Sequence, residues 1–155
     1  MILLAPPLSA QDLTFDTIHT TACLVEATEY GQRLNCIGAS ANQCMETSEG
    51  GYSTYGMSGC LSEEYAYWDQ RLNIAYKALK EITKARDLDK FETAPSQSEA
   101  LLDMQRAWIP FRDAKCDFER SEWGGGTGGG PATYSCLMYE TAKQALYLEA
   151  SADTP

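Results

Sequence analysis

The chain has 155 residues and a formal net charge of −10, from 22 acidic and 12 basic side chains. This length suits one domain with a substantial core, and no apolar run approaches the length of a membrane span. The charge argues against a nucleic-acid partner, because binding to phosphates needs clustered Lys and Arg. It favours solubility and attraction to a cationic partner.

The cysteine set indicates the compartment. None of the six lies in a CxxC or a haem-attachment motif, and their spacing fits no zinc template, so we predict neither a metal site nor a cofactor. Disulfides formed in an oxidising compartment explain the set better, which predicts a periplasmic or secreted protein. The spacing leaves the connectivity open among Cys23, Cys36, Cys44, Cys60, Cys116 and Cys136.

The first ten residues, MILLAPPLSA, resemble the second half of a secretory signal peptide, with small residues before the cleavage site. They lack a basic n-region, so the alternative is an unstructured tail. We favour a signal remnant cleaved after Ala10, because the cysteines independently indicate export. Residues 1–10 are therefore left out of the predicted fold.

The first folded segment is predicted to be a helix from Asp16 or Thr17 to about residue 34. Its residue His19 is the only histidine, and near a helix start it is interpreted as exposed or capping rather than catalytic. Residues 35–59 read as a loop with short helical turns around 40–47, restrained by cysteines at its start, middle and end.

The clearest helix is predicted from Cys60 to about Asp87. Ser62 is its expected N-cap, and Glu63 and Glu64 follow in the first turn, where the helix dipole favours acidic side chains. Its apolar face repeats every three and four residues, at Leu61, Tyr65, Trp68, Leu72, Tyr76, Leu79 and Ile82.

The next helix is predicted from Pro95, with Ser96 or Ser98 at its start, to about Arg120. Arg112 lies one turn after Trp108, so its guanidinium is expected across the indole ring. The alternative is that Arg112 only satisfies backbone carbonyls freed by a kink, which is expected at Pro110. One face is expected to consist of Leu101, Met104, Trp108, Phe111 and Ala114.

Two glycine triplets flank Thr127 between Trp123 and Pro131, without the lysine of a phosphate-binding loop. We interpret residues 105–136 as two helices joined at their shared end by a Cys116–Cys136 disulfide. Such a bond contributes about 3 kcal/mol on the chain-entropy account. A last helix is predicted over residues 133–149, with inward-facing Leu137, Thr141, Ala145 and Leu148.

These elements predict an all-α fold, because no segment has the two-residue period of a strand. The expected architecture is a disulfide-stapled antiparallel helical bundle of three long helices plus an N-terminal helix. Catalysis is not expected, since the paired carboxylates Glu63–Glu64 and Asp87–Asp89 lie on a cap and a connection. A single histidine and oxidised cysteines leave no catalytic triad and no thiolate.

Three segments together resemble the LprI-type lysozyme-inhibitor domain of exported bacterial proteins: GCLSEEYAYWDQRLNIAYKAL, LLDMQRAWIPFRDAKC and, after the glycine loop, CLMYETAKQAL. The resemblance implies a domain over residues 44–150, an N-terminal helical extension over 11–43 and a tail over 151–155. It also implies the disulfides Cys44–Cys60 and Cys116–Cys136, which leaves Cys23 to pair with Cys36.

The residues that match the family's three helices are Asp69, Leu72, Asn73 and Tyr76, then Gln105, Trp108, Arg112 and Cys116, then Cys136, Leu137, Thr141 and Leu146. One departure is Gln144, where the family commonly has arginine.

The resemblance and the negative charge make a lysozyme-type glycosidase the expected partner, inhibited by occlusion of its cleft. Candidate contacts near the glycine loop, where Trp and Arg are typical anchors, are Glu119, Arg120, Trp123 and Thr127. The alternative function is a non-inhibitory envelope module that holds a small apolar ligand or a partner protein in a pocket between aromatic helix faces. A third alternative is a structural stress-related protein with no discrete site.

Overall fold

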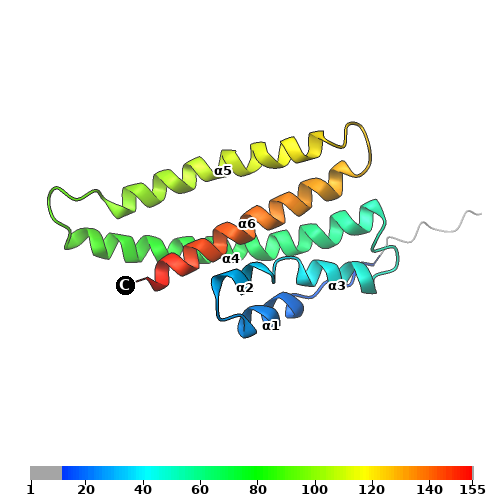
Figure 1. Cartoon of the computed structure of the whole chain (residues 1–155), viewed down its shortest axis with the longest axis horizontal. Helices are drawn as coiled ribbons and strands as arrows, with labels where there is room; N and C mark the ends of the chain where they lie inside the picture. Colours follow the sequence, from blue (N-terminus) through cyan, green and yellow to red (C-terminus); the bar gives the residue numbers. More distant parts are fainter. Residues whose placement is uncertain (1–11, 155) are drawn as a thin grey trace, which may run out of the picture.

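The computed structural model describes residues 12–154, so the predicted signal remnant lies outside the described residues. Within that range the chain is helical and has no strand, which confirms the predicted fold class. The bundle consists of three long helices, α4 (Thr54–Leu88), α5 (Gln97–Ser121) and α6 (Gly129–Asp153). Figure 1 shows α6 crossing α4 and running beside α5, with the short N-terminal helices gathered against one half of the bundle.

The N-terminal segment folds as separate short helices and not as the predicted single helix. These are α1 (Ile18–Glu26), α2 (Tyr30–Leu34) and α3 (Ala39–Thr47), the last of which confirms the predicted helical turns around residues 40–47. The break between α1 and α2 occurs because Ala27 is extended and Glu29 forms a capping box with Gln32.

Helix α4 begins six residues before the predicted start, and its N-cap is Ser53 rather than Ser62. The Ser53 hydroxyl accepts a hydrogen bond of 3.0 Å from the Gly56 amide, whereas the Ser62 hydroxyl donates to the Gly59 carbonyl inside the helix. Gly56, one of the glycines that suggested a loop, instead lies in the first turn of α4. A Cβ at Gly56 would lie 2.2 Å from the Gly50 carbonyl oxygen, so this position needs glycine for close packing.

Helix α5 begins as predicted, with Ser96 as its N-cap. The predicted apolar face is wrong at its far end, because Phe111 is 61% exposed and Ala114 is also exposed. Helix α5 packs mainly on α6 and touches α4 much less, so only a narrow stripe of its surface is covered. That stripe contains Leu101, Gln105 and Cys116, with Met104 and Trp108 at its margin.

Helix α6 is longer than predicted at both ends and supplies the centre of the core. Its buried residues include Thr141, Ala145 and Leu148, as expected, while Leu137 is only partly buried. Because α6 contacts both other long helices, its small and branched side chains are covered from two sides. Trp68 of α4 is the largest fully buried side chain among the described residues.

Three disulfides join the pairs Cys23–Cys36, Cys44–Cys60 and Cys116–Cys136, the pairs that the resemblance implied. The first links α1 to the residues before α3, the second links α3 to α4, and the third links α5 to α6. No described helix is both long and apolar enough to cross a membrane.

An ion-pair cluster fixes α2 against the long helices. Glu149 of α6 accepts from both Arg71 Nε (2.6 Å) and Arg71 Nη2 (3.1 Å) of α4, and from Arg33 Nη2 (2.7 Å) of α2. Burial lowers the pKa of Arg71, but the hydrogen bonds and charge of Glu149 raise it by more, so the guanidinium stays ionised. The cluster therefore ties the N-terminal extension to the end of α6.

Candidate functional site

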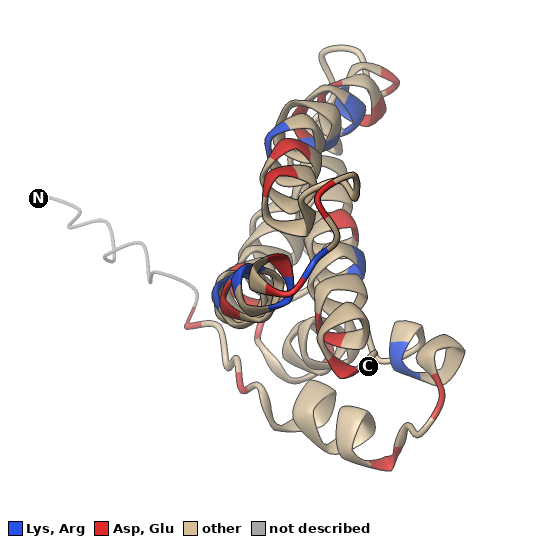
Figure 2. Cartoon of the chain, turned by 90° about the vertical axis from the view of Figure 1, so that its left-hand side faces the viewer, with Lys and Arg blue, Asp and Glu red and all other residues tan. Residues whose placement is uncertain are grey.

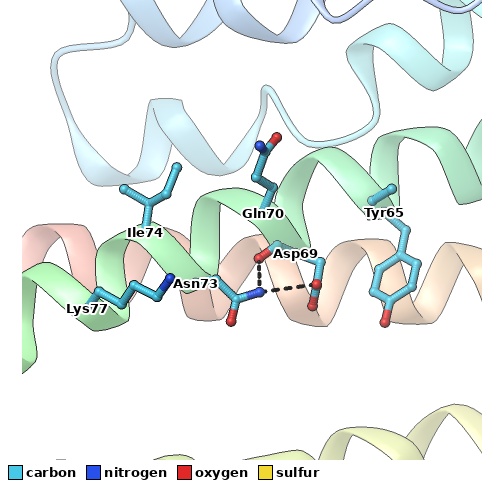
Figure 3. Close-up of a pocket in the computed structure, with 7 residues that line it drawn as sticks. Tyr65, Asp69, Gln70, Asn73, Ile74 and Lys77 are labelled. Carbon is cyan, nitrogen blue, oxygen red and sulfur yellow. Dashed lines mark hydrogen bonds between the residues drawn. The ribbon is translucent and has the colours of Figure 1, made fainter.

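The predicted α4 motif residues divide between the core and the surface. Leu72 is buried and Tyr76 packs at the core margin. Asp69 and Asn73 instead line an open pocket of about 540 Å³, in which Asn73 Nδ2 donates to the Asp69 carbonyl oxygen (2.9 Å) and carboxylate (3.2 Å). Figure 3 shows this pair between Tyr65 and Lys77, all on α4.

The α5 motif residues form contacts to α6. The Arg112 guanidinium lies 5.0 Å from the Trp108 ring centroid, as predicted, and pairs with Asp113 at 2.8 Å. Its Nη1 lies 3.5 Å from the Thr141 hydroxyl of α6. Two turns before Arg112 on α5, Gln105 accepts a hydrogen bond of 3.0 Å from Gln144. These motif residues therefore join α5 to α6. Gln144, at the position where the family commonly has arginine, makes one of these contacts.

Tyr65 lines the same open pocket on α4 as Asp69 and Asn73. Burial raises the pKa of Tyr65, the charge of Arg112 opposes that rise, and Asp69 and Asp113 reinforce it. The charges that act on Tyr65 thus come from both α4 and α5. Arg112 and Thr141, which are far apart in the sequence, meet between α5 and α6.

The residues predicted around the glycine loop are held in place by several contacts. Arg120 Nη1 lies 3.2 Å from the Thr133 hydroxyl and 3.4 Å from the Gly129 carbonyl oxygen, while Glu119 pairs with Lys115 at 3.8 Å. These contacts, together with the Cys116–Cys136 disulfide, restrain the turn between α5 and α6. The turn itself is short, because the last glycines are already in α6.

Thr127 joins this turn to the start of α4, and Trp123 packs within the turn. A Cβ at Gly128 would lie 2.2 Å from the Trp123 ring, so the indole packs directly on the glycine, yet Trp123 is 55% exposed. The Thr127 hydroxyl lies 3.5 Å from the Thr54 hydroxyl. Both predicted contacts of the loop are therefore on a fixed surface at one end of the bundle.

Two exposed tyrosines complete this surface, and the sequence reading missed them because it treated the segment as loop. Tyr52 and Tyr55 are 63% and 65% exposed and flank Thr54. We call Tyr52, Tyr55 and Trp123 the aromatic patch. Tyr55 lies in the first turn of α4 and Tyr52 lies two residues before the helix begins, so helical spacing in the sequence did not relate them.

The burial of Glu64 was not predicted, since the sequence placed it only in a first helical turn, where the helix dipole favours acidic side chains. Its carboxylate is fully buried and has no basic partner among the described residues. It accepts from Gly38 N (2.8 Å), Ala41 N (2.6 Å), Thr20 Oγ1 (2.9 Å) and Trp68 Nε1 (3.0 Å). Glu64 thus joins the N-terminal extension to α4.

Asp87, from the second pair of carboxylates, bonds to the start of α5. Asp87 accepts hydrogen bonds from the Ser96 hydroxyl and from the Gln97 and Ser98 amides, so it helps to cap α5. Among residues 12–154 no group of three His, Cys, Asp or Glu side chains is placed to hold a metal ion.

Comparison with known proteins assigns the chain to a wider group. The family described as lysozyme inhibitor LprI matches residues 44–148, which is more than half of the chain. An uncharacterised 17.7 kDa protein in the puhA 5′ region of Rhodobacter capsulatus is 29% identical over 140 residues, covering 86% of this chain and 85% of the relative. An uncharacterised protein of Rhizobium meliloti (strain 1021) is 29% identical over 114 residues, covering 72% and 82%. No solved structure matches the chain.

Proposed function

The chain belongs to the lysozyme inhibitor LprI family, and on this premise we propose that it is an exported protein that binds and inhibits a lysozyme-type glycosidase. Three disulfides support export to the periplasm or beyond the cell, since such bonds persist in oxidising compartments. We further propose that residues 44–150 are the inhibitory domain, and that 11–43 are an extension docked on it through Glu64 and Arg33.

Inhibition is proposed to occur by occlusion of the enzyme's cleft with the turn between α5 and α6. The observation that carries this assignment is a half-exposed Trp123 on a turn whose ends are held by the Cys116–Cys136 disulfide and by Arg120. A projecting anchor that is already ordered loses less entropy on binding than a flexible loop. Tryptophan and arginine are also the residue types most often found at energetic centres of interfaces.

A lysozyme turbidity assay tests this function. The purified protein is expected to slow the lysis of cell-wall suspensions by a lysozyme, and Trp123→Ala is expected to weaken inhibition at least about tenfold. The matched control is Phe91→Ala, because Phe91 is 85% exposed but lies in the connection between α4 and α5. Absence of inhibition for every lysozyme class at micromolar protein would contradict the proposal.

A second candidate function is supported by an open pocket of about 380 Å³ between α4, α5 and α6. Its lining is partly apolar, with Leu79, Leu101 and Met104 beside Tyr147 and Arg86. Such a site suits a small apolar ligand with a polar end. A retained small molecule in native mass spectrometry of the protein purified from its native envelope would favour this function over inhibition.

A further inference from the structure

We infer that the surface for the inhibited enzyme extends beyond the loop to Tyr52 and Tyr55, and that it selects a cationic protein; this inference rests on the proposed function. The patch is assembled from distant parts of the chain. Thr54, between the two tyrosines, lies 3.5 Å from Thr127, hydroxyl to hydroxyl, and Trp123 packs on the neighbouring Gly128. The turn before α4 and the turn before α6 therefore form one surface.

This surface is held rigid from both sides. Cys44–Cys60 ties α4 to α3 six residues after Thr54, and Cys116–Cys136 ties α5 to α6 beneath the loop. All four of these cysteines are buried. Three exposed aromatic rings on a surface fixed in this way can bury a large area with little ordering cost, which is the usual composition of an interface centre.

The charge around the patch determines the kind of partner. No Lys or Arg occurs between Arg33 and Arg71, or between Arg120 and Lys143, and these two stretches include all three aromatic residues of the patch. The acidic residues Glu46, Glu49, Glu63 and Glu122 lie in the same stretches and are exposed. The two stretches that carry the patch therefore supply exposed carboxylates and no basic side chain, which suits a basic protein.

The nearby basic side chains on α5 do not cancel this charge, because they are used internally. Lys115 pairs with Glu140 at 2.7 Å and with Glu119 at 3.8 Å, and Arg120 bonds to the start of α6. The opposite end of the bundle differs, since Lys77, Lys80, Lys84, Arg86 and Lys90 gather there. Figure 2, viewed from that opposite end, shows blue and red bands alternating along the long helices, with little blue among α1, α2 and α3.

The test measures binding of the full-length protein to a purified basic lysozyme by isothermal titration calorimetry. The double variant Tyr52→Ser/Tyr55→Ser is expected to bind at least about tenfold more weakly. Glu49→Lys/Glu122→Lys is expected to bind more weakly at low salt, and the difference is expected to shrink as salt rises. The same lysozyme with acetylated lysines is expected to bind the wild type more weakly. Phe91→Ala serves as the control, and circular dichroism checks that each variant is folded.

The outcomes separate the two proposals. A wild-type protein that binds lysozyme, together with tyrosine and charge variants that bind equally well, overturns the extended surface and leaves inhibition through the loop in place. Equal binding to acetylated lysozyme overturns the preference for a cationic partner. A wild-type protein that binds no lysozyme overturns the proposed function and, with it, this surface.

Discussion

Trp68 Nε1 donates a hydrogen bond of 3.0 Å to Glu64 Oε1, one turn earlier in α4, and both side chains are completely buried. The same carboxylate caps the start of α3 through the amides of Gly38 and Ala41. A carboxyl group in the core is tolerated here because each of its oxygens accepts from fixed donors. Glu64, which the sequence placed only in a first helical turn, is therefore a buried polar link between the extension and the bundle.

Glu64→Gln is expected to lower the free energy of unfolding by about 1.5–3 kcal/mol, because an amide can accept on one side only. Its NH₂ group would face a donor, either the Ala41 amide or the cluster at Oε1. Urea denaturation followed by circular dichroism measures the change. Glu63→Gln is the control, since Glu63 is exposed and adjacent. Equal stability of the two variants would contradict the proposed role of Glu64.

The double variant Cys116→Ser/Cys136→Ser is expected to lose about 3 kcal/mol of stability relative to the oxidised wild type. The bond closes a segment with a sequence separation of 20, which includes the flexible glycines, so its removal enlarges the unfolded ensemble. Denaturation with and without reductant measures this contribution. Under reducing conditions the stability gap between wild type and variant should close, and a gap that persists would point to packing damage instead.

Gly128→Ala is expected to displace the Trp123 ring, because the new methyl group would overlap it. Since Trp123 is half-exposed, the ring can swing outward, and the unfolding free energy should change by less than about 1 kcal/mol. Acrylamide quenching of tryptophan fluorescence should increase, and inhibition of lysozyme should weaken. Gly125→Ala is the matched control, as no atom lies within 4 Å of a Cβ there. Identical quenching in the two variants would show that Trp123 does not rest on Gly128.

Asp87→Asn is expected to destabilise the fold at pH 7 and to do so progressively less in acid. Hydrogen bonds from the Ser96 hydroxyl and the Ser98 and Gln97 amides hold the pKa of Asp87 well below its usual range. Because the pKa is lower in the folded chain, the carboxylate stabilises the fold fully above the unfolded pKa of about 3.9. That contribution is lost as the pH falls through the folded pKa.

Thermal unfolding at pH 7 and at a series of pH values below about 4 tests this expectation. The melting temperatures of wild type and Asp87→Asn should converge as the pH is lowered. Asp89→Asn is the control, since Asp89 lies two residues further along, just after the end of α4. A difference between Asp87→Asn and wild type that stays constant down to the lowest pH would rule out a capping carboxylate.

Features that depend on neighbours in the sequence were predictable. The period of apolar residues in α4, the Ser96 cap and the Arg112–Trp108 contact each arise between residues a few positions apart. The cysteine count indicated disulfides for the same kind of reason, because that chemistry follows from composition. The pairing itself came from resemblance, since spacing alone leaves the connectivity open.

Only the tertiary structure decided which polar and aromatic side chains are covered. Glu64 is buried because α1 and α3 lie over α4, Phe111 is exposed because α5 packs mainly on α6, and Tyr55 joins Trp123 because two turns meet at one end. Helical periodicity identifies a face of a helix, but burial depends on what packs against that face from elsewhere in the chain. A turn-like glycine such as Gly56 can likewise mark close packing within a helix.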